Sequence, residues 1–373
     1  MAEPLVNQYG VDVPHAIASM IANVYPAFDS AGFVREVLDG YDTQALMARG
    51  KKIARALRQF LPHDYAQALT ILLASAQQPH GRDPTLTLGA FLYLPHTLFV
   101  AEFGLDHFEL SMQAQHALTQ RFTAEFSIRP FLEHHSEATL RQLRVWATDP
   151  NAFVRRLVSE GTRPRLPWAP RLRQFQADPT PVLALLDVLK DDPELVVRRS
   201  VANNLNDIGK DHPDLLAKTA RDWLKDASPE RAWIVGHALR SAVKRGDSGA
   251  LSVLGFGAAA QVSVGHARIT PGQATMGGAV QIGLEVTNTQ NQPQRVLVDL
   301  AVHYVKANGQ ARAKVFKLST LDLAPGQTAA LSKKLSLAEL TTRKHYPGRH
   351  RVDVLLNGQA QPLGTFELVP GCI

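Results

Sequence analysis

The sequence contains almost no cysteine. Its one cysteine, Cys372, lies next to the end of the 373 residues, so neither a disulfide framework nor a cysteine-based zinc site can be built. Long apolar runs are missing too, because the longest candidate, LGAFLYLPHTLFVAEFG, is short and is interrupted by Pro95, His96 and Glu102. The first residues, MAEPLVNQYG, lack the basic start and apolar stretch of a signal peptide. These absences predict a protein of the reducing cytosol, with no membrane segment.

Common catalytic signatures are absent as well. The chain has no G-x-G-x-x-G after a strand, no Walker loop, no H-E-x-x-H and no G-x-S-x-G. Its histidines, among them His107, His116 and the pair His134-His135, do not combine with cysteines into a metal site. We therefore expect neither a metal nor a cofactor.

Positive charge is in excess. The formal net charge is +6, the isoelectric point is about 9.4, and 45% of the residues are hydrophobic. The apolar content is sufficient for a sizeable core, and the basic balance favours an anionic partner, of which nucleic acid is the commonest. Mild basicity without a specific partner remains the alternative.

The apolar pattern changes its period along the chain. From about residue 11 to 255, segments such as VPHAIASMIANVY and TQALMARGKKIARALRQFL place apolar residues at helical spacing. From about residue 262, segments such as VQIGLEVTN and RVLVDLAVHYV alternate as strands, with turns such as TPGQ and NGQ between them. We predict a helical domain over residues 1–257 and an immunoglobulin-like β-sandwich over residues 262–373.

The helical part contains an internal repeat. FVRRLVSEG and VVRRSVANN align with their arginine pairs 43 residues apart, and WIVGHAL is a weaker third copy. A D-P or S-P turn precedes each copy. Helix pairs repeating at this period indicate a HEAT-like solenoid, whose concave face suits an elongated ligand.

Arginines recur in register with the repeat. The cations that we expect to form a ladder for the phosphates of a polyanion are Arg155, Arg156, Arg198 and Arg199, extended by Arg163 and Arg165 and joined by Lys210 and Lys218. The alternative is that each arginine pairs with an aspartate of the next loop. That alternative suits Arg155 and Arg198 better than Arg163 and Arg165, which lie in a loop.

Polar residues occupy one equivalent position in the three copies, namely Glu160, Asn203 and His237. Either this position faces solvent, or the second helix of each repeat lines the groove. A further acid, Glu125, lies among phenylalanines in LTQRFTAEFSIRPFL. A carboxylate beside aromatic side chains is unfavourable unless it is paired or used. It pairs with Arg121 or Arg129 on a helix, or it stabilises a positive charge.

Three segments carry a resemblance to a known family. LTQRFTAEFSIRPFL, WATDPNAFVRRLVSEGTRPRLPW and VVRRSVANNLNDIGKDHPDLL resemble the HEAT-repeat DNA glycosylases, in particular the AlkC branch of the AlkC/AlkD superfamily. The resemblance covers about residues 1–255, and some members of this branch carry an immunoglobulin-like domain. It implies hydrolysis of the N-glycosidic bond of cationic lesions such as 3-methyladenine and 3-methylcytosine in double-stranded DNA, without a closed base-flipping pocket.

The resemblance also implies roles for single residues. Glu125 stands where the family has its catalytic carboxylate, Arg156 where an arginine contacts the backbone near the lesion, and Trp168 where an aromatic borders the lesion. Asn203 replaces a tryptophan of the AlkD branch, which leaves the role of that position open. The group acting beside Glu125 is Asp207, Glu160 or His237. We expect a monomer that acts on nucleoid DNA in the cytosol.

Two other interpretations remain. The chain is a scaffold without catalytic activity that binds a protein partner, or it binds DNA but has lost hydrolysis. The basic segment TTRKHYPGRHR, residues 341–351, is either a second DNA contact or an ordinary solvated loop.

Overall fold

The computed structural model describes residues 5–77, 90–257, 259–339 and 344–371, and the only cysteine lies outside these ranges. The described chain forms two compact units. The first, which we call the helical unit, comprises Glu3–Asp211 and Asp226–Ala238; the second, the strand-rich unit, comprises mainly His212–Lys225 and Leu239–Ile373. In the described residues no helix is both long and apolar enough to cross a bilayer.

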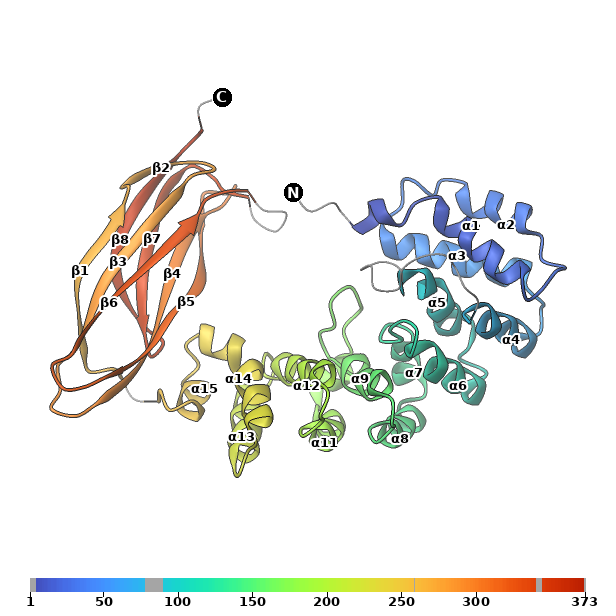
Figure 1. Ribbon diagram of the computed structural model, residues 1–373, viewed down its shortest axis with the longest axis horizontal. Helices are drawn as coiled ribbons and strands as arrows, with labels where there is room; N and C mark the ends of the chain where they lie inside the picture. The colour runs from blue at the N-terminus through green and yellow to red at the C-terminus, as the bar shows by residue number, and fades with distance from the viewer. Residues whose placement is uncertain (1–4, 78–89, 258, 340–343, 372–373) are drawn as a thin grey trace. The chain divides into compact units, whose positions relative to one another are not determined.

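The helices follow the predicted period (Figure 1). Their bounds are α1 Asp12–Ala22, α2 Ser30–Leu38, α3 Leu46–Phe60, α4 Tyr65–Ser75, α5 Leu94–Phe103, α6 Phe108–Thr119, α7 Ile128–His134, α8 Ser136–Trp146, α9 Ala152–Gly161, α10 Arg173–Ala177, α11 Thr180–Leu189, α12 Leu195–Ile208, α13 Pro213–Leu224, α14 Pro229–Lys244 and α15 Ser248–Val253. Short 3-10 turns cover Leu5–Gln8 and Ala90–Tyr93. The helical domain type expected from the sequence is confirmed.

The repeat is visible in the turns that start its helices. The Asn151 amide bonds Asp149 Oδ1 at 2.7 Å, and the Glu194 amide bonds Asp192 Oδ1 at 2.9 Å. An aspartate that accepts from the amide two residues on makes a tight turn and frees the following segment to enter a helix. The same turn therefore recurs 43 residues later, at the start of α9 and of α12.

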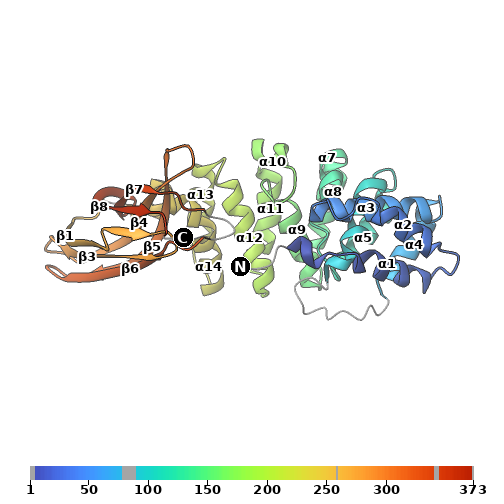
Figure 2. The same cartoon turned by 90° about the horizontal axis from the view of Figure 1, so that it is seen from above.

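Helices α9 and α12 pack against each other, as Figures 1 and 2 show. Each presents one apolar face to the core, for example Val154 and Leu157 on α9 and Val201 and Leu205 on α12, all fully buried. The start of α7 meets the end of α9 so closely that a Cβ on Gly161 would lie 2.5 Å from an Ile128 methyl carbon. Glycine at that position therefore lets the two helices approach.

Two sheets form the sandwich of the strand-rich unit. One has the order β1-β3-β6, with bounds Val262–Thr270, Ala279–Asn288 and Thr328–Ser336. The other has the order β2-β8-β7-β4-β5, with bounds Gln273–Thr275, Gln359–Val369, Gly348–Leu356, Gln294–Val305 and Ala311–Leu323. All pairings are antiparallel except β2 with β8.

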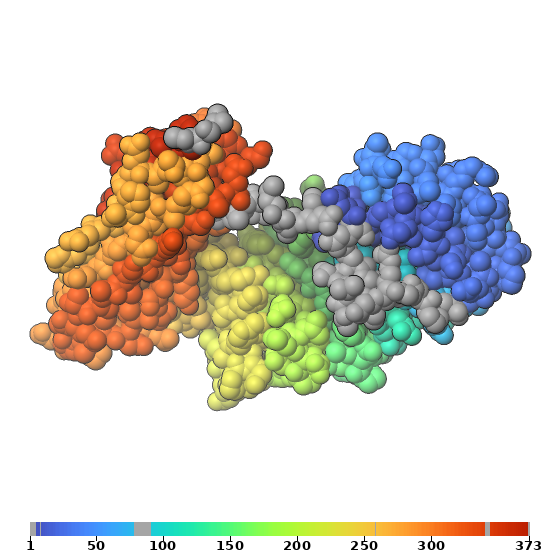
Figure 3. Space-filling view, turned by 45° about the horizontal axis from the view of Figure 1, so that its top comes forward, coloured from blue at the N-terminus to red at the C-terminus, as the bar shows by residue number. Residues whose placement is uncertain are grey.

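The core of the sandwich comes from alternate residues of both sheets, including Val280, Ile282, Val298, Leu300 and Phe366. The predicted sandwich is confirmed, and β2, β6 and β8 are added to the strands that the alternation had indicated. The exposed sides of the strands make up the orange and red surface in Figure 3. Leu251 of α15 and Phe256 pack against Leu297 of β4. These contacts join α15 to the sandwich.

Candidate active site

Glu125 lies in the turn before α7 and not on a helix. Its carboxylate accepts hydrogen bonds from the Thr123 hydroxyl at 2.7 Å and from Arg156 Nη2 at 2.8 Å. Arg156 reaches across from α9 and also donates to Thr123 Oγ1 at 3.0 Å. The alternative that Glu125 pairs on a helix with Arg121 or Arg129 is therefore wrong, because the chain turns between these residues.

The Glu125–Arg156 pair is only partly shielded from water. The two side chains are 12% and 23% exposed, respectively. Next to the acid along the chain, Phe126 is half-buried, whereas Phe122 is buried against Phe91 at a ring distance of 5.0 Å. One face of the acid is thus held by protein groups, and an approaching ligand can still reach it.

A second set of ion pairs joins α9 and α12 through Arg163, which bonds the two acids Glu160 and Asp207. Arg163 Nη1 donates to Glu160 Oε1 at 2.6 Å, and Arg163 Nε donates to Asp207 Oδ2 at 2.8 Å. The other oxygens of the two acids are also bonded, Glu160 Oε2 by the Ser200 hydroxyl at 2.6 Å and Asp207 Oδ1 by Lys210 at 2.7 Å. Glu160, Asp207 and Arg163 are all buried, so the arrangement is fixed by packing.

Arg156 connects the two pairs, because its Nη2 lies 4.0 Å from Glu160 Oε2. We call the resulting set the charge network; its members are Glu125, Arg156, Glu160, Arg163, Asp207 and Lys210. Three acids and three cations alternate, so the network is neutral. The structure therefore brings two of the three alternatives for the group beside Glu125, namely Glu160 and Asp207, into one network with it.

Burial by itself would lower the pKa of the Arg163 guanidinium. Glu160 and Asp207 nevertheless raise that pKa above its ordinary value, through their charges and hydrogen bonds together. Arg163 thus remains a cation between two carboxylates. Its buried position is that of a structural counter-ion rather than a surface group.

Trp168 lies in the loop between α9 and α10, residues 162–172, which we call the Trp168 loop. Its backbone is in the left-handed region, with φ +64°, and the residue is 63% exposed. Left-handed backbone is unfavourable for a bulky residue, and tryptophan is on average highly buried. Such strain is often found at functional sites.

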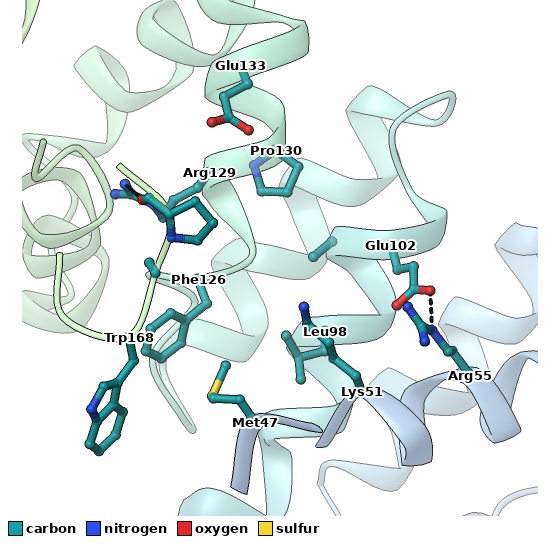
Figure 4. A pocket seen from close by; sticks show the side chains of 13 residues that line it. Met47, Lys51, Arg55, Leu98, Glu102, Phe126, Arg129, Pro130, Glu133 and Trp168 are labelled. Atoms are coloured by element: carbon teal, nitrogen blue, oxygen red, sulfur yellow. Dashed lines mark hydrogen bonds and ion pairs between the residues drawn. The ribbon is translucent and has the colours of Figure 1, made fainter. Parts of the chain in front are cut away.

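A cavity of about 410 Å³ adjoins this loop (Figure 4). Phe126, Trp168 and Pro170 line it on one side, and Met47 and Leu98 line it from α3 and α5. The ion pair of Arg55 Nε with Glu102 Oε1, at 2.5 Å, borders it as well. The cavity thus combines aromatic and apolar walls with charged groups, and Phe126 connects it along the chain to Glu125 of the charge network.

Two arginines of the repeat are tied to the turns. Arg155 donates to both Asp192 oxygens, at 2.6 and 3.1 Å, and to the Asp149 carbonyl at 2.8 Å. Hydrogen bonding to Asp192 raises the pKa of Arg155. Arg198 donates to the carbonyls of Asp192 and Pro193 at 3.0 and 2.5 Å. The structural alternative is confirmed for Arg155, whereas Arg198 bonds carbonyls of its own repeat's turn instead.

The prediction that pairing with an acid suits Arg163 and Arg165 less well than Arg155 and Arg198 is wrong, because both loop arginines have acidic partners. Arg165 Nε donates to Asp211 Oδ2 at 2.8 Å, and this bond raises the pKa of Arg165. Loop residues pair in this way because the Trp168 loop lies against the segment after α12. By contrast, Arg199 is exposed, and among the described residues no hydrogen bond or ion pair engages its guanidinium.

Asn203 and His237 both lie on the second helix of their repeats and are half-buried. The His237 ring stacks on exposed Trp233, with centroids 5.0 Å apart and planes within 7°. Asn203 stands 43 residues after Glu160, at the equivalent place on α12. The repeat therefore places Glu160, Asn203 and His237 on the equivalent face of α9, α12 and α14.

No group of three potential metal ligands occurs among the residues that the structure describes. His116 bonds Asp149 Oδ2 at 2.8 Å, and His135 bonds the Leu105 carbonyl at 3.0 Å. In the basic segment 341–351, residues 341–343 lie outside the described ranges. Arg351, at the other end of the segment, lies on β7, and its Nε is 3.2 Å from Asp353 Oδ1 on the same strand.

Sequence reasoning missed two partners of the network, Thr123 and Ser200, and it named Arg129 only as a possible partner of Glu125. Arg129 donates to three carbonyls, of Gly161, Arg163 and Pro170, at 3.1, 2.8 and 2.5 Å. A lone arginine in an apolar helix face, here SIRPFL, is the only signal the sequence offers.

The chain is similar to two known proteins over nearly its whole length. Its structure matches the Pseudomonas fluorescens alkylpurine DNA glycosylase AlkC bound to DNA containing an abasic site analog, with a TM-score of 0.91, 41% identity, and coverage of 98% of this chain and 100% of that chain. It is 35% identical over 361 residues to the Bacillus subtilis protein YhaZ, covering 96% of this chain and 98% of YhaZ. Residues 113–239 match a family described as DNA alkylation repair enzyme, and residues 263–370 match the C-terminal Ig-like domain of YhaZ.

Proposed function

The chain belongs to the family of DNA alkylation repair enzymes that includes AlkC, and on this premise we propose that it is a DNA N-glycosylase for cationic N3-alkylated bases. The proposed lesions are 3-methyladenine and 3-methylcytosine in double-stranded DNA. One observation carries the proposal: a partly exposed carboxylate, Glu125, is held by Thr123 and Arg156 and is followed in the chain by Phe126, which lines one cavity together with exposed Trp168.

The chemistry follows from charge. Alkylation at N3 makes the base a cation, which weakens the glycosidic bond, and departure of the base leaves oxocarbenium-like charge on the sugar. The Glu125 carboxylate stabilises that charge and orients the attacking water, and preorganised charge of this kind is a large part of catalysis. The face of Trp168 attracts the cationic sugar and base, a contact worth about 0.5–2 kcal/mol.

The network sets how the acid is presented. Arg156 bonds Glu125 from one side while its own side chain stays 23% exposed, so it also reaches a phosphate next to the lesion. Glu160 and Asp207, both bonded by Arg163, add two more negative charges to the network that holds Glu125. We assign Asp207 and Asn203 supporting roles around the reacting sugar.

The cations divide into two groups. Arg199, Lys210 and His237 are the groups we propose for DNA contact, with Arg156 nearest to the lesion. Arg155, Arg163, Arg165 and Arg198 hold the repeats together, and they contribute to DNA binding through the positive field and the placement of neighbours. A monomer acting on nucleoid DNA in the cytosol is the proposed working form.

A non-catalytic scaffold that binds DNA or a protein partner is the other candidate, favoured by the extent to which the arginines are already paired. Base release separates the two. Methylated duplex DNA is incubated with the protein, and free 3-methyladenine and 3-methylcytosine are quantified.

We expect release by the native chain and a loss of about 10²–10³-fold in the single-turnover rate for Glu125→Gln. Binding to abasic-site DNA should be retained, because the substitution removes a negative charge near the phosphates. The matched control is Glu137→Gln, an exposed acid of the nearby helix α8 that lies outside the charge network and the cavity lining. Equal rates for the Glu125 variant and the native chain would refute the catalytic assignment, and no release at all would favour the scaffold.

A further inference from the structure

The Trp168 loop holds an unfavourable conformation without regular secondary structure. Within it, the Leu172 amide bonds the Pro164 carbonyl at 3.2 Å, and the Ala169 amide bonds the Leu166 carbonyl at 3.4 Å. The first bond is at the long end of the normal range and the second is longer than that range. The side chains of Arg163 and Arg165 also tie the first part of the loop to Asp207 and Asp211. None of these bonds reaches Pro170, so the part of the loop that carries Trp168 needs a further interaction to hold it in place.

Arg129 of α7 provides that interaction. Its Nη1 donates to the carbonyls of Gly161 and Arg163, at the first end of the loop, and its Nη2 donates to the carbonyl of Pro170, at the far end. One planar guanidinium therefore spans both ends of the loop that presents Trp168. Figure 4 shows Arg129 and Trp168 on the same side of the cavity.

The position of this cation is energetically unfavourable in itself. Arg129 is only 4% exposed, and burial lowers its pKa to about 10. No carboxylate of the described residues forms an ion pair with it within 4.0 Å; its acceptors are backbone carbonyls. A position that only had to fill space would be occupied at less cost by an apolar side chain.

The guanidinium also connects the loop to the acids. Arg129 follows Glu125 by four residues, so the turn before α7 carries Glu125 and the first turn of α7 carries Arg129. The Arg163 carbonyl accepts from Arg129, while the Arg163 side chain bonds Glu160 and Asp207. Displacement of Arg129 would therefore change the distance between the indole of Trp168 and the carboxylates.

We propose that Arg129 is a positioning residue: it sets the place of Trp168 relative to Glu125 by clamping both ends of the Trp168 loop. The proposal rests on the proposed glycosylase function for its kinetic consequence, but not for its structural one. Arginine is required because its two terminal nitrogens donate in a fixed fork, whereas the single ammonium of lysine donates from one point.

The first test is a double-mutant cycle in single-turnover base release with Arg129→Met, Trp168→Ala and the combination. Displacement of a positioned group by about 1 Å lowers rates on the order of 10²-fold, so we expect Arg129→Met to slow release by about 10–100-fold. If Arg129 acts through Trp168, it should add less than about 2-fold to the loss already caused by Trp168→Ala. Affinity for abasic-site DNA should change little, because the effect is on the chemical step.

Two further variants keep the test decisive. Arg129→Lys retains the charge and most of the volume, and we expect it to fold and to recover only part of the rate. Arg49→Met is the matched control, since Arg49 is also buried and also bonds carbonyls, those of Gln44, Val6, Tyr9 and Asp42, far from the loop. Arg49→Met should lower thermal stability, but it should not change the rate loss that Trp168→Ala causes in the double-mutant cycle.

The second test does not depend on catalysis. Arg165, Arg171 and Arg173 are tryptic sites in or beside the loop, whereas Arg163 precedes Pro164 and is not cleaved, so limited trypsin digestion reports opening of the loop. We expect faster cleavage there in Arg129→Met than in Arg49→Met at equal distance below each melting temperature. Losses that multiply in the cycle, or cleavage no faster than in the control, would overturn the proposal. Absence of base release with faster cleavage would instead overturn the glycosylase function and leave the clamp standing.

Discussion

Replacement of Arg163 by methionine isolates the role of the charge network in stability. The change keeps an apolar stem and removes the guanidinium that bonds Glu160 and Asp207. Asp207 retains Lys210 at 2.7 Å. Glu160 keeps only the Ser200 hydroxyl at 2.6 Å and Arg156 at 4.0 Å. The uncompensated charge therefore falls on Glu160.

The magnitude follows from burial. The side chains of Arg163, Glu160 and Asp207 are 10%, 8% and 2% exposed, so water cannot replace the lost cation. Breaking a buried ion pair by removing one partner destabilises by about 3–5 kcal/mol. We expect a loss of this size in the free energy of unfolding at neutral pH, which is a large part of the stability of a typical domain.

Urea unfolding followed by circular dichroism at neutral pH measures this loss. The double variant Arg163→Met with Glu160→Gln is the control, and it should be more stable than Arg163→Met alone because it lacks the uncompensated charge. A loss below about 1 kcal/mol for Arg163→Met, with no gain in the double variant, would show that the network is solvated and that the reasoning from burial is wrong.

Two further outcomes follow from single residues. Burial lowers the pKa of His96, which is fully buried beside the Ser75 hydroxyl, from 6.5 to about 4. As the pH falls from 6.5 to about 4, the unfolded chain therefore binds a proton before the folded chain does, and the free energy of unfolding should drop by about 3 kcal/mol. His96→Gln should remove this drop from urea unfolding curves. Identical pH dependence in the two proteins would contradict this. Arg199→Ala should reduce the slope of log affinity for DNA against log salt by about 1, whereas Arg155→Ala, already paired with Asp192, should leave the slope unchanged; a reversed result would exchange the roles of the two arginines.

The sequence alone determined the architecture because its signals are local. The helical period, the alternating strands and the recurrence of Asp-Pro turns each depend on residues a few positions apart, and α9, α12 and β4 formed where those patterns lie. The family resemblance was likewise carried by contiguous segments such as VVRRSVANNLNDIGKDHPDLL. The 43-residue repeat also placed Glu160 and Asn203 at equivalent positions.

Only the tertiary structure decided which charged side chains pair with one another inside the protein. Arg155 and Arg156 are neighbours, yet the first bonds Asp192 across the repeat and the second bonds Glu125 in front of α7. Their directions differ by about 100°, one residue's rotation on a helix, and the partners lie more than thirty residues away in the chain. Periodicity fixes the face of a helix, but the neighbour at that face is fixed by how repeats pack, and so the clamp by Arg129 and the burial of Arg163 could not be read from the sequence.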